Sequence, residues 1–581
     1  MDFDVVIVGG GPAGLSTSIK LMQISEEKNL DLNICLLEKG SEIGAHILSG
    51  AVIDTRALDT LLPDWESENG FIQTPVEKDE MLFLSGESSA INVPNFLMPR
   101  TLMNHGNRII SLGSLCKYLG DKAEAMGVNI FPGFPAVDLI MEGDQIQGVI
   151  TGDMGLDKNG EPKDGHELGY ELRAKQTVFA EGCRGSLGKK IIASFELDKD
   201  CDPQHYGIGF KEVWSIDPEL HQEGLVLHTA GWPLDNHTEA GGFVYHAPNN
   251  QLYIGLIISL DYKNPNMSPY NEFQKWKTHK KISSLLKGAE RVSYGARALN
   301  KGGIQSIPKL TIPGGIMVGC EAGFMNGAKI KGTHTAMQSG ITAAEVIVSQ
   351  LQTDGPGNEI ENYNEELDKT WLMSELYQAR NFSPLLKKFG LMIGSPLVWI
   401  DQNILRGRLP FTLSAASKDH EQLKKQSEAE PIEYEKYDNV ITFDRTSSIY
   451  LSGVNHEEDQ PCHLKLTDPE IPIATNLPLY GEPARLYCPA GVYEVIDGGD
   501  GIDVVDFSDA SATVTVNLDA GTSSVSGDTD TLKNIENVIG SIQADTINGD
   551  DDANRIDGAG GGDTIDGGGG DDTVIGGDGS D

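Results

Sequence analysis

Near its amino end the chain carries four apolar, β-branched residues that lead directly into a glycine-rich turn and a helix-like stretch. A strand, a GxGxxG turn and a helix in this order are typical of a parallel sheet that binds a dinucleotide. Gly9 permits the tight turn, Gly11 lets the backbone approach a pyrophosphate, and Gly14 lets the helix pack on the strand. The residues predicted to bind the cofactor here are Val8, Gly9, Gly10, Gly11, Pro12, Ala13, Gly14 and Leu15.

A second predicted strand over residues 33–37 ends in Glu38, where an acidic side chain can accept hydrogen bonds from an adenosine ribose. Two later segments, 177–185 and 314–324, are typical of strand ends followed by turns, and such repeated returns to one nucleotide favour FAD over NAD. No second GxGxxG is present in the sequence, so we expect no separate nicotinamide domain. Further cofactor contacts are predicted at Glu181, Gly182, Gly319 and Gly323.

Long segments within residues 1–495 resemble the electron-transfer-flavoprotein:ubiquinone oxidoreductases, and they are more specific than the glycine pattern. The resemblance implies an FAD enzyme that takes electrons singly from reduced electron-transfer flavoprotein and passes pairs to ubiquinone. It also implies a glutathione-reductase-type FAD domain with an interleaved quinone-binding domain, and no side chain that acts as a catalytic acid or base. The segments that carry the resemblance are 44–51, 62–65, 104–107, 206–212, 231–235, 294–300, 305–309 and 329–335.

The family resemblance also predicts which residues bind the quinone and which segments contact the membrane. The quinone head group is expected against Gly302 and Gly303, where backbone amides can reach a carbonyl oxygen that gains charge. Two apolar surfaces, near Ala51–Phe71 and Leu385–Gly407, are expected to contact the membrane from one side. No apolar run is long enough to span a bilayer, and no signal or transit peptide is expected. The predicted location is the cytoplasmic face of a bacterial cytoplasmic membrane.

Cys488 lies in a Cys-Pro-Ala-Gly-Val-Tyr-Glu segment, which in the family supplies one ligand of a four-iron four-sulfur cluster. The family's later CxxCxxC run is missing from this sequence, and Cys462 adds only one more thiol upstream. A cubane cluster normally requires four thiolates. We therefore predict a truncated ferredoxin-like remnant over residues 428–495, with Cys488 as a remnant ligand and no stable cluster. The scattered cysteines suit a reducing compartment.

From about Ile496 the composition changes to glycine and aspartate in nine-residue units, which resemble the RTX (haemolysin-type) calcium repeats. In such a unit the glycines turn the chain, aspartate and carbonyl oxygens bind a shared Ca²⁺, and one aliphatic side chain is buried between stacked turns. The resemblance implies a parallel β-roll over residues 496–581. Its buried residues would be Ile547, Ile556, Ile565 and Val574. Its calcium ligands would include Asp503, Asp563, Asp572 and Asp581.

The net charge of the chain limits the kinds of partner that it is expected to bind. The formal charge is −41, and the last 86 residues contain twenty acidic residues against Lys533 and Arg555. Such a balance argues against a nucleic acid partner and favours cations.

The expected architecture is therefore an α/β body over residues 1–427 with FAD-binding and ubiquinone-binding domains, then the remnant, then the roll. The abrupt change near residues 493–497 favours an engineered, misassembled or recent join over a natural fusion. Two alternatives stay open. One is a lipid-reducing flavoprotein of geranylgeranyl-reductase type that consumes NAD(P)H, and the other is a calcium-binding RTX fusion protein whose flavin body is inert.

Overall fold

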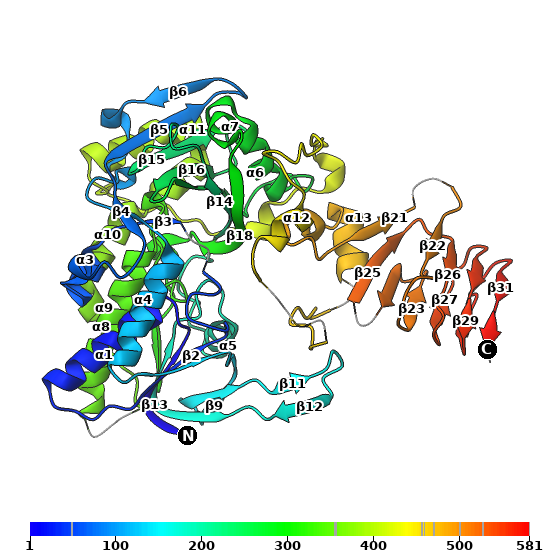
Figure 1. Ribbon diagram of the computed structural model, residues 1–581, viewed down its shortest axis with the longest axis horizontal. Coiled ribbons are helices and arrows are strands. Elements are labelled where there is room, and N and C mark those ends of the chain that lie inside the picture. The colour runs from blue at the N-terminus through cyan, green and yellow to red at the C-terminus, as the bar shows by residue number, and fades with distance from the viewer. Residues whose placement is uncertain are drawn as a thin grey trace.

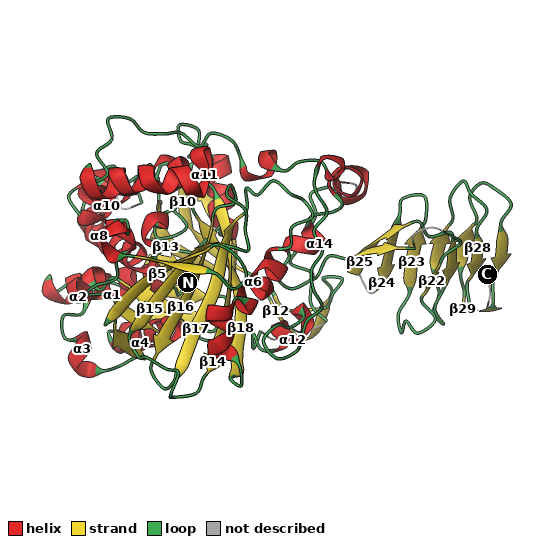
Figure 2. Cartoon of the chain, turned by 90° about the horizontal axis from the view of Figure 1, so that it is seen from above, coloured by secondary structure: helices red, strands yellow, loops and turns green. Residues whose placement is uncertain are grey.

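The computed structural model describes residues 1–47, 50–353, 357–454, 457, 459–468, 471–498, 501–525 and 528–579. A large mixed α/β body holds most of the chain, and an elongated arm of short strands leaves one side of it and carries the carboxyl end (Figure 1). The arm is built almost entirely of strands and loops, whereas the body combines sheets and helices (Figure 2).

The first sheet of the body is parallel at its centre, in the order β8-β2-β1-β13-β20. Its middle strand β1 (Asp2–Val8) is fully buried from Val5 to Ile7, as expected for β-branched residues covered on both faces. The other strands are β2 (Ile34–Glu38), β8 (Asn129–Pro132), β13 (Glu171–Phe179) and β20 (Gly315–Met317), with antiparallel additions β9 (Ala136–Glu142), β10 (Gln145–Thr151) and β19 (Thr311–Ile312).

Two helices cross closely beside this sheet. The helix α1 (Pro12–Glu27) packs on α8 (Thr333–Leu351), and a Cβ on Gly340 would lie 2.5 Å from the Ala13 carbonyl oxygen. A larger residue at Gly340 would push α8 away from the start of α1. The remaining helices around this part of the body are α2 (Arg56–Leu61), α3 (Trp65–Glu68), α4 (Leu112–Ala125), α5 (Ser186–Ser194), α9 (Tyr363–Asp368) and α10 (Trp371–Ala379).

The second sheet is antiparallel except where β15 pairs with β5, and its order is β18-β14-β17-β16-β15-β5-β6. An aromatic core that includes Phe210, Phe273 and Trp276, all fully buried, packs between this sheet and α6 (Pro269–Thr278). Its strands are β5 (Lys78–Leu84), β6 (Ala90–Val93), β14 (Tyr206–Ser215), β15 (Leu225–Gly231), β16 (Ala240–Ala247), β17 (Gln251–Ser259) and β18 (Glu290–Asn300). The helix α7 is Lys280–Leu286.

Smaller elements complete the body. The longest late helix is α11 (Phe382–Trp399), which is kinked at Gly390 and continues into the π-helical turn Ile400–Ile404. Residues 428–495 are mostly irregular and lie against the second sheet. There the Tyr270 hydroxyl donates to the Phe443 carbonyl at 2.6 Å. The other elements are β3 (Ala51–Ile53), β4 (Gln73–Pro75), β7 (Arg108–Ile110), β11 (Met154–Leu156), β12 (Pro162–Glu167), α12 (Arg445–Tyr450), α13 (Leu477–Tyr480) and α14 (Ala484–Tyr487).

In the second half of the arm, β26, β27 and β28 pair in parallel with strands eighteen residues further along, so that the chain coils between two sheets. Val538 pairs with Ile556 in one sheet and Ile547 with Ile565 in the other. Ile547 and Ile556 are fully buried as expected, but Val574 is 48% exposed. The strands are β21 (Val495–Asp497), β22 (Val504–Asp506), β23 (Val514–Asn517), β24 (Thr522–Val525), β25 (Asp528–Lys533), β26 (Asn537–Ile539), β27 (Thr546–Asn548), β28 (Arg555–Asp557), β29 (Gly560–Gly561), β30 (Thr564–Asp566), β31 (Thr573–Ile575) and β32 (Asp578–Gly579).

Candidate functional site

The turn between β1 and α1 forms a glycine cradle, defined here as Gly9–Gly14. Gly9 has φ +113°, and a Cβ there would lie 2.4 Å from the Ala180 carbonyl oxygen. A Cβ on Gly14 would lie 2.0 Å from the Gly9 carbonyl oxygen, so α1 starts in direct contact with the turn. Above Gly11, in contrast, a Cβ would meet no atom within 4 Å. The turn is closed on two sides and open at the position where the fingerprint approaches a phosphate.

Glu38, at the end of β2, holds this turn in place. Its Oε2 accepts the Gly10 N–H at 3.0 Å and its Oε1 accepts the Gly40 N–H at 2.7 Å. Because the side chain is only partly buried, it lies at the rim of the cradle. Its predicted contact with a ribose stays a prediction.

The loops after β13 and β20 both reach the cradle. Ala180 touches Gly9, and a Cβ on Gly319 would lie 2.7 Å from the Ala13 Cβ. Gly182 has φ +91° and open space beside it. These contacts bring three segments that are far apart in the sequence to one edge of the sheet. The carboxylate of Glu181 instead accepts N–H groups at the start of α5, so its predicted cofactor contact stays a prediction.

Gln204 joins this edge to the Gly302-Gly303 pair, and sequence reasoning missed it. Its Oε1 accepts the Gly302 N–H at 2.7 Å, and its Nε2 lies 2.7 Å from the position that a Cβ on Gly323 would take. Gly323 has φ +87° and Gly303 has φ +70°, which favour glycine at both positions. The predicted cofactor loop and the predicted quinone loop therefore meet at one amide side chain. A lone glutamine between motifs carries no sequence signal for such a role.

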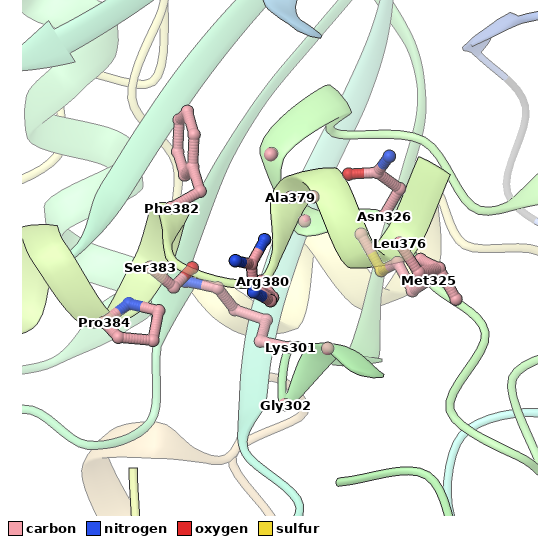
Figure 3. A pocket seen from close by; sticks show the side chains of 13 residues that line it. Lys301, Gly302, Met325, Asn326, Leu376, Ala379, Arg380, Phe382, Ser383 and Pro384 are labelled. Atoms are coloured by element: carbon pink, nitrogen blue, oxygen red, sulfur yellow. The ribbon is translucent and has the colours of Figure 1, made fainter. Parts of the chain in front are cut away.

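Gly302 and Gly303 line a cavity together with residues from the start of α11, shown in Figure 3. Arg380 lies at its centre and donates to the Leu409 carbonyl at 2.6 Å, while Lys301 extends toward Ser383. The free space is about 30 Å³, so a ring can enter only if side chains move. The lining residues are Lys301, Gly302, Gly303, Met325, Asn326, Gly327, Ala328, Leu376, Ala379, Arg380, Phe382, Ser383 and Pro384.

Beside this cavity lies a buried ion cluster. Glu375 Oε1 accepts from the Asn326 amide at 2.9 Å and lies 2.8 Å from His334 Nε2. Lys329 Nζ donates at 2.9 Å to both Glu375 and Asp54. Burial raises the pKa of Glu375, but hydrogen bonds from His334 and Lys329 outweigh burial and hold that pKa well below its usual range.

Asp54, His334 and Glu375 are close enough to hold a metal ion, and they form the one such group among the described residues. Their charges are already balanced, because Arg56 and Lys329 both pair with the two carboxylates. Arg56 and Lys329 already pair with the carboxylate oxygens that a metal ion would bind. The cluster is therefore a structural ion network that braces α8 and α10 beside the cavity.

An exposed apolar patch lies on α11 and on the segment after β6. Met392 is 65% and Ile393 62% exposed on α11, and Phe96 is 72% exposed. The two segments are joined, because the Trp399 indole N–H donates to the Phe96 carbonyl at 3.1 Å. The members of the apolar patch are Phe96 and Leu97 after β6, Phe389, Met392 and Ile393 on α11, and Ile400 and Ile404 on the π-helical turn that continues it.

The expected apolar surface at Ala51–Phe71 is wrong. Its large apolar side chains are buried, with Leu58 fully buried and Trp65 2% exposed. They belong to the core under the first sheet, and hydropathy alone does not separate a core segment from a membrane-facing one. The segment 385–407 does carry exposed apolar residues. No helix in the described parts of the chain combines the length and apolar character needed to cross a membrane.

Cys488 is buried at the end of α14, whereas Cys462 is exposed and its thiol contacts the Leu464 carbonyl. These two are the only cysteines in the sequence of residues 428–581. A cubane cluster needs four thiolates, so the donors available in this region do not fit one.

Asp503, Asp563 and Asp572 lie in loops between the strands of the arm. Asp563 Oδ1 accepts the Asp545 N–H and Asp572 Oδ1 accepts the Asn554 N–H, both at 2.9 Å across one turn of the coil. A Cβ on Gly498 would lie 2.6 Å from the Asp503 Cβ, so Asp503 turns back on its own repeat. The carboxylates of Asp563 and Asp572 are thus each oriented by a backbone amide from the preceding turn of the coil. Asp581 lies outside the described residues.

Comparison with known proteins adds two family matches. Residues 206–299 match the family described as "ETF-QO, ubiquinone-binding", and residues 439–512 match "Electron transfer flavoprotein-ubiquinone oxidoreductase, 4Fe-4S". The second match includes Cys462 and Cys488 and runs past the start of the arm.

Whole-chain relatives give the same family. The chain is 52% identical over 504 residues to the electron transfer flavoprotein-ubiquinone oxidoreductase of Pseudomonas aeruginosa, covering 86% of this chain and 92% of the relative. It is 47% identical over 513 residues to the mitochondrial protein of that name from Bos taurus, covering 86% and 82%. Among solved structures, a geranylgeranyl bacteriochlorophyll reductase-like protein from Thermoplasma acidophilum aligns with TM-score 0.53 at 17% identity, over 72% of this chain and 94% of that one.

Proposed function

Because the chain belongs to the electron transfer flavoprotein-ubiquinone oxidoreductase family, we propose that it passes electrons from reduced electron-transfer flavoprotein to ubiquinone. The likeness to the geranylgeranyl-reductase-like structure concerns the fold alone, so a lipid-reducing activity has no separate support. The observation that carries the proposal is identity of about half the residues over 86% of the chain.

FAD binds in the glycine cradle in this proposal. The open space above Gly11, the free amides at the start of α1 and the rim position of Glu38 fit an extended dinucleotide. The loops at Gly182 and Gly319 form its other walls. When bound, the flavin supplies the ability to accept electrons one at a time and release them in pairs. The chain supplies binding and orientation, with no catalytic acid or base.

Ubiquinone approaches the Gly302-Gly303 pair. The pair lies next to Gln204, which also touches the loop of Gly323, so this site adjoins the cofactor edge of the sheet. Backbone N–H groups free of side chains can donate to a carbonyl oxygen that gains charge on reduction. Phe382, Ser383 and Pro384 at the start of α11 form part of the same cavity.

The apolar patch lies on the surface of a membrane in this proposal. It continues along the same helix that lines the cavity, so a lipid-soluble quinone can pass from the bilayer to the Gly302-Gly303 pair without crossing water. Exposed Met392 and Ile393 with Trp399 nearby suit an interfacial helix that lies in the membrane plane. The protein is then peripheral, and a bacterial cytoplasmic membrane is the expected location.

No stable four-iron four-sulfur cluster forms in this proposal, because Cys462 and Cys488 are only two thiols. Electron entry from the physiological donor is then slower than in relatives with four cysteines. Residues 428–495 act as a ferredoxin-like remnant.

The arm is an RTX-type parallel β-roll that binds Ca²⁺ through Asp503, Asp563 and Asp572, and through Asp581 in the last repeat. The eighteen-residue spacing of its parallel strand pairs supports this interpretation. Calcium then offsets the charge of the twenty acidic residues in this region.

A quinone-reduction assay tests the proposal. The purified chain is loaded with FAD and reduced with dithionite, and its reoxidation by a short-chain ubiquinone analogue is followed. We expect reoxidation in the wild type and at least a tenfold slower rate in Gly302→Val, because its side chain would meet Ser306 and Gln204. Gly86→Val is the matched control, since a Cβ there meets no atom within 4 Å. Equal rates in all three proteins would contradict the quinone site, and an absence of bound FAD would favour an inert flavin body.

A further inference from the structure

Two carboxyl side chains meet at the start of α5, behind the loops that wall the glycine cradle. Glu181 follows β13, and its carboxylate accepts three backbone N–H groups of α5 at 2.9 to 3.2 Å. Glu321 follows β20 and is 7% exposed. The position that a Cβ on Gly185 would take lies 2.6 Å from Glu181 Oε2 and 2.2 Å from Glu321 Oε2, so the two oxygens are neighbours.

The two carboxyl groups cannot both carry a charge at low cost. Glu181 accepts backbone N–H groups at the amino end of α5, where the positive end of the helix dipole lies. Glu321 Oε2 has no hydrogen-bond partner among the described residues, and the backbone N–H groups of Gly185 and Glu181 favour the charged form of the Glu321 carboxyl less than burial and Glu181 oppose it. Burial, followed by the charge of Glu181, raises the pKa of Glu321 well above its usual range. A protonated Glu321 is a hydrogen-bond donor, and the neighbouring Glu181 oxygen is an acceptor.

Other ionisable groups around Glu321 do not change this assignment. Lys189 on α5 is the cation that favours the charged form of Glu321, and its effect is smaller than those of burial and of Glu181. The remaining groups are two thiols, a phenol and two guanidinium groups. They are Cys183 and Arg184 after β13, Cys320 beside Glu321, Tyr206 on β14, and Arg297 on β18, which faces Cys183.

Glu181 and Glu321 lie on the two loops, after β13 and β20, that contact the glycine cradle. The residue before Glu181 touches Gly9, and Gly319, two residues before Glu321, touches Ala13. We propose that Glu321 is a positioning residue, whose neutral carboxylic acid donates a hydrogen bond to Glu181 and ties the β13 and β20 loops together around the FAD cradle. This inference rests on the proposed FAD function.

The FAD affinity of the purified protein tests the proposed hydrogen bond between Glu321 and Glu181. Glu321→Gln keeps a neutral donor of the same length and should bind FAD within about twofold of the wild type. Glu321→Ala removes the proposed hydrogen bond to Glu181, and we expect its dissociation constant for FAD to rise about tenfold or more. Glu345→Ala, a partly exposed glutamate on α8, is the matched control and should change nothing.

The pH dependence of unfolding, measured on protein without FAD, is a second readout. In the folded state Glu321 keeps its proton to a higher pH than in the unfolded chain, where its pKa is near the ordinary 4.5. The stabilising contribution is complete below about pH 4.5 and is lost as pH rises toward the folded-state pKa. The unfolding equilibrium constant of the wild type should therefore rise by up to tenfold per pH unit relative to that of Glu321→Gln.

Two results would overturn the inference. One is an FAD affinity for Glu321→Gln as weak as that for Glu321→Ala, because the neutral donor would then be irrelevant. The other is a pH dependence of unfolding that is the same in the wild type and in Glu321→Gln. If the wild type bound no FAD at all, the proposed function would fail, whereas the comparison of unfolding would still decide whether the carboxyl pair exists.

Discussion

The body and the arm of this chain are stabilised in different ways. The body buries long apolar strands and aromatic residues, together with ion pairs such as Glu212 and Lys277. The arm has a small core of nine buried aliphatic residues among the described ones, with aspartates in its loops. Hydrophobic burial does not depend on ions, whereas closely spaced carboxylates need a counter-charge. The comparison indicates that one chain can hold two regions that respond to different conditions.

Removal of calcium should produce the largest difference in stability between the arm and the body. With excess chelator we expect the arm to lose its strands, since its carboxylates repel one another without the cation, while the thermal transition of the body stays unchanged. Circular dichroism and limited proteolysis between residues 490 and 581, with and without Ca²⁺, measure the effect.

The arm also offers a matched pair of variants. Asp572→Ala should raise the calcium concentration needed for folding, whereas Asp571→Ala, an exposed neighbour, should have little effect. If the arm kept its strands in chelator, or if both variants behaved alike, the calcium role would be refuted.

Within the body, the largest single-residue effect is expected at the buried ion pair. Lys277 Nζ lies 2.9 Å from both oxygens of Glu212, and neither side chain is exposed. Lys277→Ala leaves a buried carboxylate beside Arg291 alone, and should cost about 3–5 kcal/mol in the free energy of unfolding. Urea unfolding followed by tryptophan fluorescence measures the loss.

Lys369→Ala is the control for this pair. It removes an exposed lysine that pairs with Glu365 and Glu366, and should cost below about 1 kcal/mol. A loss of similar size in both variants would show that burial of the Glu212–Lys277 pair is unimportant.

Acid should weaken the body through His246. Its Nδ1 accepts the Gln222 N–H at 2.9 Å, and burial lowers its pKa to about 4 from 6.5. A base with a lowered pKa contributes stability that is present above pH 6.5 and lost as pH falls toward 4, about 3 kcal/mol at full effect. His246→Asn, which keeps an acceptor, should flatten this dependence. Exposed His237→Asn should leave the slope unchanged, and an unchanged slope in His246→Asn would contradict the assignment.

The apolar patch should give a smaller effect. The double variant Met392→Ser with Ile393→Ser should reduce binding to phospholipid vesicles by about 2 kcal/mol, because two exposed apolar side chains no longer enter the interface. Sedimentation with vesicles measures the change. Ile72→Ser, at an exposed position outside the patch, is the control, and an equal loss there would remove the special role of α11.

Local patterns in the sequence predicted part of this molecule. The strand Val5–Val8 and the turn that follows were predictable, because the apolar run and the spacing of the glycines are local patterns in the sequence. The burial of Ile547 and Ile556 followed from the nine-residue period. The membership in the oxidoreductase family was predicted from long motifs and is confirmed by the relatives.

Long-range contacts were not predictable in the same way. Gln204 joins two loops that lie about 100 residues further along the chain, and nothing in its own neighbourhood marks it. The ion cluster of Asp54, Lys329 and Glu375 and the carboxyl pair of Glu181 and Glu321 also depend on the packing of distant strands. The apolar segment 51–71 was misassigned for the same reason, since only the fold decides whether an apolar side chain meets a core or a membrane.

In the proposed function the glycine cradle holds a flavin. The most direct measurement is the FAD released by acid from gently purified protein, compared with the protein concentration. We expect one FAD per chain in the wild type and a strong loss in Gly9→Val, whose side chain would collide with the Ala180 carbonyl. A colourless wild-type protein that releases no FAD, and takes up none when FAD is added, would contradict it.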